Sequence, residues 1–472
     1  MALTIVSADD TNGITFAQGT DITVLSGVTV SNAAPSGDAL RVTSTTYNDG
    51  QVTILGTLVA DRFGIDAILS LNGSNSVSGS TFYIGSTGQI FAGSYGIVLQ
   101  DGANASPVIN YGEIYGSTSA INISSASGGG GAFNIVNYGA ISSSDSSTID
   151  IGLGNTGSIL NTGTMTNLGS QTVVLALSGG ALDLRNSGTM STGGEIAIFS
   201  SAAADIYNSG DIFGGVFLSV QADIIRNTGL IDGDIYFASS NDVYRGFGGT
   251  VTGIIRGESG DDTFFVDQVD VVIDGGLGYD TVYARADFTS GGGIEKIVLQ
   301  GSDNLDATGD YGANVIRGNK GDNDLNGGSG IDTLFGGVGN DVLNGGADDD
   351  ILRGGAGNDI LVGGTGLDVM FGGTGPDVFV FETVADSGTG ALRDRIRDFE
   401  IGIDLIDLSG LSDEEFSFEG TTGFSATGPS LYYSVNAAGR AIVRLDVDGD
   451  GAQDMQILLN DVTLLTADDF IL

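Results

Sequence analysis

GNKGDNDLN, GGSGIDTLF, GGVGNDVLN, GGADDDILR, GGAGNDILV, GGTGLDVMF and GGTGPDVFV follow one another without a break from residue 318 to residue 380. Six of these seven nonapeptides have Asp at the sixth position, namely Asp332, Asp341, Asp350, Asp359, Asp368 and Asp377. All seven have an apolar residue at the eighth position, namely Leu325, Leu334, Leu343, Leu352, Leu361, Met370 and Phe379. A fixed period that combines glycine, aspartate and one apolar residue predicts a stacked β-solenoid.

Each nonapeptide joins a Gly-rich turn to a short strand with one inward apolar side chain. Two units make one coil, and coils stacked about 4.8 Å apart place the aspartates in rows along the turns. Carboxylates roughly 5 Å apart repel by about 3 kcal/mol at an effective dielectric near 20. Calcium takes six to eight oxygen ligands, which two facing turns supply. We therefore predict several Ca²⁺ ions in a parallel β-roll that is unfolded without calcium.

Some units depart from the pattern. Asn323 replaces the aspartate in the first unit, and Asp348 stands where glycine is usual in the fourth. Two units upstream, Gly257–Phe265 and Gly275–Tyr283, place Asp262 and Asp280 eighteen residues apart in the same phase. The alternative is a disordered acidic linker, but the fixed apolar eighth position argues against it.

The first half carries a looser repeat of the form N-x-G followed by an apolar strand. It occurs at Asn48, Asn110, Asn137, Asn161, Asn186, Asn208 and Asn227, with Ser86-Thr-Gly between the first two. The spacing from Ser86 onward is close to the length of one β-helix coil, and an Asn amide can hydrogen-bond to its equivalent one coil away. We predict a right-handed parallel β-helix; the alternative is an antiparallel sandwich of many short strands.

These patterns make the chain all-β and divide it into three parts. Residues 1–250 form the β-helix, residues 251–380 the calcium roll, and residues 381–472 a carboxyl-terminal β cap. The nonapeptide phase is lost over residues 284–317, which we interpret as an insert in the roll.

Composition excludes several functions. The formal net charge of −43 makes nucleic acid and anionic membranes poor partners. The chain has no His, Cys or Trp, so disulfides, thiolate metal sites, His-based zinc sites and Ser-His-Asp arrangements are absent. The start MALTIVSADDTNGITF lacks a basic n-region, and no apolar run reaches membrane-spanning length. We expect no N-terminal signal peptide and no membrane span.

Three strings follow the roll: DRIRDFEIGIDLIDLSG (394–410), LDVDGDGAQDMQILL (445–459) and LTADDFIL (465–472). With the nonapeptides, they make the chain resemble the bacterial repeats-in-toxin (RTX) proteins, and the end of the chain resembles the serralysin C-terminal domain. The resemblance implies that the six repeat aspartates bind calcium, with Asp398, Asp404 and Asp407 as candidates for a terminal site. The phase of the two upstream units adds Asp262 and Asp280 as calcium ligands. It also implies type I secretion to the extracellular space through an uncleaved carboxyl-terminal signal, with the type I secretion machinery as a partner. The serralysin zinc site needs His, so the protease activity does not carry over.

Asp446, Asp448, Asp450 and Asp454 follow the spacing of the first part of an EF-hand loop. The twelfth position is Ile457 instead of Glu. The alternative is a polar hairpin between two strands without an ion.

For the whole chain we expect a non-enzymatic surface, adhesion or matrix protein that contacts cell-surface glycans or associates with itself. The competing hypothesis is a polysaccharide-modifying enzyme, a lyase or epimerase, on the β-helix. A lyase needs a basic residue, and the first 240 residues offer only Arg41, Arg62, Arg185 and Arg226. Glu113 and Glu195 are the only glutamates there, and Asp205 and Asp211 flank a turn.

Overall fold

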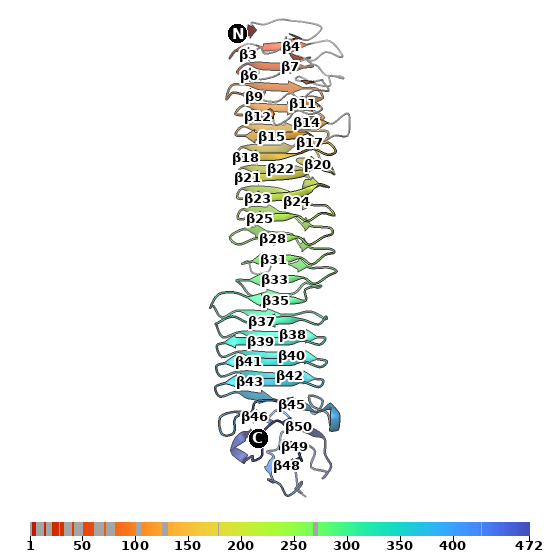
Figure 1. The fold of residues 1–472 in the computed structure, drawn as a ribbon, viewed down its shortest axis with the longest axis vertical. Coiled ribbons are helices and arrows are strands. Elements are labelled where there is room, and N and C mark those ends of the chain that lie inside the picture. Colours follow the sequence, from red (N-terminus) through yellow and green to blue (C-terminus); the bar gives the residue numbers. More distant parts are fainter. Residues whose placement is uncertain are drawn as a thin grey trace. The chain divides into compact units, whose positions relative to one another are not determined.

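The computed structural model describes residues 2–5, 14–15, 21–27, 29–32, 40–41, 51–60, 70–71, 81–100, 106–124, 131–177, 179–267, 272–425 and 427–472. The chain divides into two compact units, Met1–Asp262 and Thr263–Leu472. Most strands of each unit are stacked as parallel rungs (Figure 1). In the described part of the chain, no helix has the length and apolarity needed to cross a membrane.

In the first unit, a typical coil contributes one strand to one sheet and two strands to a second sheet. The first sheet consists of β1 (Ala2–Ile5), β3 (Asp21–Val24), β6 (Gln51–Ile54), β9 (Thr81–Ile84), β12 (Ser106–Asn110), β15 (Ala132–Asn137), β18 (Thr156–Asn161), β21 (Ala181–Asn186), β23 (Ala203–Asn208), β25 (Ile224–Asn227) and β28 (Val243–Arg245). Strands β2 (Ile14–Thr15) and β5 (Leu40–Arg41) pair separately.

The second sheet of this unit contains the remaining strands in two rows. They are β4 (Thr29–Asn32), β7 (Thr57–Ala60), β8 (Ser70–Leu71), β10 (Gln89–Ala92), β11 (Tyr95–Gln100), β13 (Glu113–Gly116), β14 (Ser119–Ser124), β16 (Ala140–Ser143), β17 (Ile149–Ile151), β19 (Thr164–Asn167), β20 (Val174–Ala176), β22 (Thr189–Ser200), β24 (Asp211–Phe217), β26 (Leu230–Asp232), β27 (Ile235–Tyr236), β29 (Thr250–Val251) and β30 (Ile255–Arg256). Alternation along the strands places Ile, Val and Leu inside and mostly Ser, Thr and other polar residues outside, except for the buried Asn residues that end the strands of the first sheet.

The N-x-G turns hold these coils in register. The Asn side chains are 0–1% exposed, and from Asn110 to Asn227 each Nδ2 donates to Oδ1 of the next coil over 2.8–2.9 Å. The glycine is required sterically, because a Cβ on Gly163 would lie 2.1 Å from the carbonyl oxygen of Gly139. This amide ladder confirms the predicted role of the repeat; Asn48 lies outside the described residues.

The second unit continues with two strands per coil. One sheet contains β31 (Thr263–Val266), β33 (Thr281–Ala284), β35 (Lys296–Leu299), β37 (Val315–Arg317), β39 (Thr333–Val338), β41 (Ile351–Ala356), β43 (Val369–Thr374) and β45 (Asp394–Ile396). The facing strands are β34 (Phe288–Thr289), β36 (Asp306–Thr308), β38 (Asp324–Ser329), β40 (Val342–Ala347), β42 (Ile360–Thr365), β44 (Val378–Val380) and β46 (Leu405–Asp407), and β32 (Ile273–Asp274) precedes them. The eighth residues of all seven nonapeptides are 0% exposed, as expected of a thin core.

Residues 284–317, which the sequence suggested to be an insert, contribute strands to the same stack. Strands β35 and β37 pair in register between β33 and β39, and β36 pairs between β34 and β38. The segment Gly309–Arg317 is a further nonapeptide with Asn314 at its sixth position. Because this unit has no aspartate at the sixth position, the sequence pattern did not reveal that it keeps the nine-residue phase.

The roll ends in a small antiparallel group of strands. Strands β48 (Ser430–Val435), β49 (Ala441–Asp446) and β50 (Met455–Leu459) are antiparallel, and β50 is parallel to β45. Strand β47 (Ser417–Phe418) pairs with β48, and β51 (Phe470–Ile471) pairs with β46. Two short 3₁₀ helices, η1 (Gly390–Leu392) and η2 (Ala467–Asp469), lie in the connections.

The predicted all-β parallel solenoid is confirmed, and the sandwich alternative is wrong. All strand pairs described in the first unit are parallel, whereas hairpins would make them antiparallel.

Replacement of Asn161 by Ala should lower the free energy of unfolding of the first unit by about 2–3 kcal/mol. It would leave Nδ2 of Asn137 and Oδ1 of Asn186 without their buried partners. Denaturant unfolding measures the change. Asn134→Ala is the control, because its half-buried amide accepts one bond, from Ser158, and should cost under about 1 kcal/mol. Equal losses would contradict a structural role for the amide ladder.

Candidate metal centre

The sixth residues of alternate nonapeptides form two ladders in the second unit. The first ladder is Asn314, Asp332, Asp350, Asp368 and Asp394; the second ladder is Asn323, Asp341, Asp359, Asp377 and Asp404. In both ladders, each backbone N–H donates to Oδ1 of the next rung over 2.7–3.0 Å. These side chains are 0–2% exposed. One carboxylate oxygen of each rung therefore serves the stacking of the coils.

The second carboxylate oxygen of most rungs, Oδ2, makes no hydrogen bond between coils. Within the described residues, Oδ2 is buried and has no hydrogen-bond partner in the six repeat aspartates and in Asp394. Burial of a carboxylate oxygen without a donor is costly, and a regular series of such atoms points to a missing ligand.

The orphan oxygen faces a second oxygen across a space that only glycine leaves open. A Cβ on Gly345 would lie 2.4 Å from Oδ2 of Asp350 and 2.6 Å from the carbonyl oxygen of Gly363. The same arrangement recurs at Gly327, Gly336 and Gly354. A carboxylate and a carbonyl that converge on one point repel each other unless a cation or a proton lies between them.

The two asparagine rungs show how a turn closes without an ion. Oδ1 of Asn314 accepts the N–H of Asp310 at 2.9 Å, and its Nδ2 donates to the carbonyl oxygen of Ile294 at 2.6 Å. Asn323 does the same with Asn319 and Leu305. An Asn amide can make all its hydrogen bonds with the backbone of such a turn because it carries both donors and an acceptor, whereas an ionised aspartate only accepts.

Burial is the main electrostatic effect at these carboxylates. It raises the pKa of Asp350 to about 8, with further increases from Asp368, Asp332 and Asp348, against the lowering effect of the Asp332 N–H. Burial likewise raises the pKa of Asp368 and Asp377 to about 7 and of Asp332 and Asp341 to about 6. Without a cation, ionisation of the ladders opposes folding above the ordinary carboxyl pKa.

A hard divalent cation fits this donor set. The donors are carboxylate and carbonyl oxygens, without nitrogen or sulfur, which suits Ca²⁺. The six repeat aspartates and the turn carbonyls would hold the ions. A bound Ca²⁺ would supply positive charge between successive turns, and the chain's own contribution is to fix the oxygens in rows.

The remaining sequence-predicted ligands differ from the repeat aspartates. Both oxygens of Asp404 accept backbone N–H groups, from Asp377 and Glu400, and both oxygens of Asp398 accept N–H groups, from Gly372 and Gly373. Oδ1 of Asp407 accepts the N–H and the hydroxyl of Ser409, two residues further along the chain. Asp262 and Asp280 are buried in comparable turns. Calcium ligation by all these residues stays a prediction.

Sequence reasoning missed three buried aspartates. Asp394 is the last rung of the first ladder, and burial, then Asp368, raises its pKa to about 9. Asp223 and Asp242 form a ladder with Asp262 in the first unit, in which the Asp223 N–H donates to Asp242 and the Asp242 N–H donates to Asp262 over 2.6–2.7 Å. In the sequence, Asp223 and Asp242 are marked only by their position two residues before a buried apolar residue. The Gly-rich turns that mark the nonapeptides do not precede them.

The turn at residues 237–242 has the backbone of a nonapeptide turn without its glycines. Ala238 and Ser240 have φ of 76° and 93°, where the roll has Gly346 and Asp348 with φ of 107° and 80°. The Ser240 N–H donates to the Ser259 carbonyl at 2.9 Å, as the Gly330 N–H does to Ala347 at 3.1 Å. The roll geometry therefore begins within the first unit.

Comparison with known proteins agrees with this geometry. Residues 313–472 match the family model described as Peptidase M10 serralysin C terminal. This part of the chain is an RTX repeat region of the serralysin C-terminal type.

Two solved structures of the Azotobacter vinelandii mannuronan C5-epimerase are also similar. The AlgE6R3 subunit is 30% identical, with 36% of this chain and 80% of that chain covered and a TM-score of 0.20. The AlgE6R2 subunit is 29% identical, with 33% and 90% covered and a TM-score of 0.21. At these TM-scores the likeness supports no inference about activity. None of the curated proteins matches the chain.

Replacement of Asp350 by Asn should have opposite effects with and without calcium. In chelator the RTX region should gain about 1–3 kcal/mol of stability, because a buried carboxylate becomes an amide that can donate like Asn314. In calcium the region should lose stability and bind ions more weakly, because one ligand is gone. Denaturant unfolding under both conditions measures the two changes.

The control is Asp303→Asn, the same charge change at an exposed position of the same unit. It should shift stability by less than about 0.5 kcal/mol in either condition. A loss of stability for Asp350→Asn in chelator, equal to its loss in calcium, would show that the carboxylate is structural and holds no ion.

Proposed function

We propose that this chain is an exported, calcium-dependent solenoid protein whose RTX region folds outside the cell. The series of buried Oδ2 atoms without donors carries the proposal. In calcium-poor cytosol the ladders would oppose stacking, so the chain stays open enough for export; extracellular calcium then fills the turns. If each site binds near ~10⁻⁴ M, ~1 mM calcium adds roughly 1.4 kcal/mol per site.

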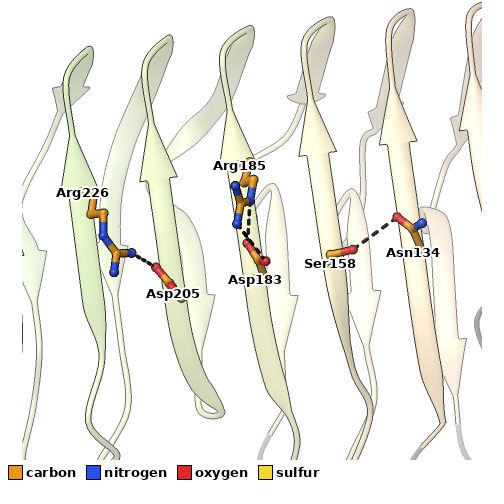
Figure 2. Close-up of polar contacts among 6 residues, drawn as sticks. All are labelled: Asn134, Ser158, Asp183, Arg185, Asp205 and Arg226. Atoms are coloured by element: carbon orange, nitrogen blue, oxygen red, sulfur yellow. Dashed lines mark hydrogen bonds and ion pairs between the residues drawn. The ribbon is translucent and has the colours of Figure 1, made fainter.

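A non-enzymatic role is favoured by the state of Arg185 and Arg226, the two of the four candidate arginines whose side chains the structure describes. On the outer face of the first sheet, Arg185 pairs with Asp183 of the same strand and Arg226 pairs with Asp205 of the neighbouring coil (Figure 2). A lyase base must lose its proton readily, whereas arginines in exposed ion pairs keep their charge. We infer that this face is for binding or lateral packing.

A hollow on the second sheet is the place that we assign to a glycan. It has a volume of about 620 Å³ and contains the carboxylates of Glu195, Asp232 and Asp234. Its aromatic side chains are Phe213, which is 38% exposed, and the stacked pair Phe217 and Tyr236, with ring centroids 4.2 Å apart. The hollow exists because β22 is longer than β24, so their register shifts between Ser191 and Ile196.

The chemistry of the hollow suits a neutral saccharide. Aromatic faces take the C–H faces of sugar rings, and carboxylates accept bonds from hydroxyls. Three carboxylates repel an acidic polysaccharide. The Ile254 N–H and then Arg256 hold the pKa of Asp234 below its ordinary value, so Asp234 stays ionised and is no general acid.

Phe213→Ala should weaken binding of a neutral polysaccharide by about tenfold, because an aromatic contact is lost. Affinity electrophoresis with neutral and acidic polysaccharides measures it. The matched control is Leu168→Ala, another exposed apolar side chain of the first unit that does not line the hollow. Equal binding by both variants would remove the glycan from the proposal, and release of unsaturated products from an acidic polysaccharide would favour the lyase.

Deletion of residues 464–472 should keep the protein inside a host that carries a type I exporter. The protein in the medium and in the cells measures the effect. Because Phe470 also packs on Phe418 and β51 pairs with β46, the deletion disturbs the fold as well. The control is Phe470→Ala, which removes the ring and keeps the segment; it should be exported. Export of the shortened chain would contradict a carboxyl-terminal secretion signal. It would not contradict calcium binding by the ladders.

A further inference from the structure

The loop between β49 and β50 holds a group of carboxylates outside both ladders. Residues 446–454 read DVDGDGAQD, and three of the four aspartates converge: Asp446, Asp448 and Asp454 each place one carboxylate oxygen within 4.8 Å of the others. Neighbouring oxygens at this separation suit a calcium ion, which binds oxygens at 2.3–2.6 Å.

One oxygen of this group has the signature of the ladder sites. Asp446 is 0% exposed, and among the described residues its Oδ1 is buried without a hydrogen-bond partner. Its Oδ2 accepts the N–H of Gly451 at 2.9 Å. The hydrogen bond to Oδ2 thus fixes the Asp446 carboxylate in the acidic loop, whereas Oδ1 has no donor.

The other two carboxylates are fixed in the same way. Asp454 accepts the N–H of Val447 on Oδ2 at 2.7 Å, and Asp448 accepts the N–H of Asp450 on Oδ1 at 3.1 Å. Each residue therefore has one oxygen bonded to the loop backbone. Among the described residues, no salt bridge includes any of these three aspartates.

We propose that the β49–β50 loop binds one Ca²⁺ through Asp446, Asp448 and Asp454. The donors are carboxylates alone, which excludes soft metals. Ile457, at the position where an EF-hand has its bidentate Glu, is 0% exposed in β50 and gives no ligand, so water completes the shell. The site is separate from the nonapeptide turns and does not depend on the proposed function.

The site also has a structural consequence. Strand β50 pairs with β45 so that Ile457 lies opposite Asp394, the last rung of the first ladder. An ion that fixes the start of β50 therefore stabilises the strand on which the roll ends.

Native mass spectrometry of the full chain in increasing calcium tests the proposal. Asp448→Asn should bind one ion fewer than the natural chain at saturation, and Asp454→Asn should do the same. Because Asp448 is exposed, its replacement leaves the fold intact. Asp413→Asn, an exposed aspartate outside the loop, should keep the full number.

Hydrogen exchange of the peptide spanning residues 446–455 gives a local readout. In the natural chain calcium should slow its exchange, and in Asp448→Asn this effect should disappear while the nonapeptides keep their calcium-dependent protection. An unchanged ion count in both variants, or calcium-independent exchange of this peptide in the natural chain, would overturn the proposal. Loss of protection in the nonapeptides alone would bear on the ladders and not on this loop.

Discussion

The carboxylate oxygen that has no donor is the constraint on which the RTX region depends. Each ladder aspartate uses Oδ1 to accept a backbone N–H from the preceding coil, so the side chain must be buried for the coils to stack. Burial leaves Oδ2 of the six repeat aspartates with nothing to donate to it, and in four of them, Asp332, Asp341, Asp350 and Asp359, this atom faces a glycine carbonyl oxygen. The hydrogen bond that stacks the coils therefore also buries a negative charge, which opposes the stacking. A cation would neutralise this charge and join neighbouring turns, because it would bind the oxygens that the stacking brings together.

The two units solve the same stacking problem with different side chains. In the first unit the buried rung is Asn, whose amide donates to the coil on one side and accepts from the coil on the other. That ladder is complete in water without an ion. In the second unit the rung is Asp, and Asn314 and Asn323 show that Asn fits the same position. Aspartate there is thus no steric requirement, and under the proposed function its value lies in making the fold conditional on a cation.

The sequence predicts the stack well because its signals are periodic. The apolar eighth residues, the N-x-G turns and the aspartate period each repeat many times, so irregular single units did not hide the fold. The nonapeptide at Gly309–Arg317 was missed because Asn314 replaces the aspartate that marks the phase. Asp242 was missed because its turn lacks the glycines that mark the repeat. Ala238 and Ser240 adopt the positive φ of those glycines instead. Which oxygen remains without a donor depends on three-dimensional hydrogen bonding, and no spacing rule gives it.

The same distinction separates the acidic groups at the end of the chain. Asp398 and Asp404 fit a familiar motif, yet backbone N–H groups occupy both oxygens of each. Asp446 belongs to an incomplete EF-hand pattern, yet it keeps a buried oxygen free of donors. Where all oxygens are bonded to the backbone, a carboxylate already contributes to the fold and gains less from an ion. Where one oxygen has no donor, the carboxylate costs stability unless a cation binds, so the proposed calcium binding would have its largest effect on folding at such positions.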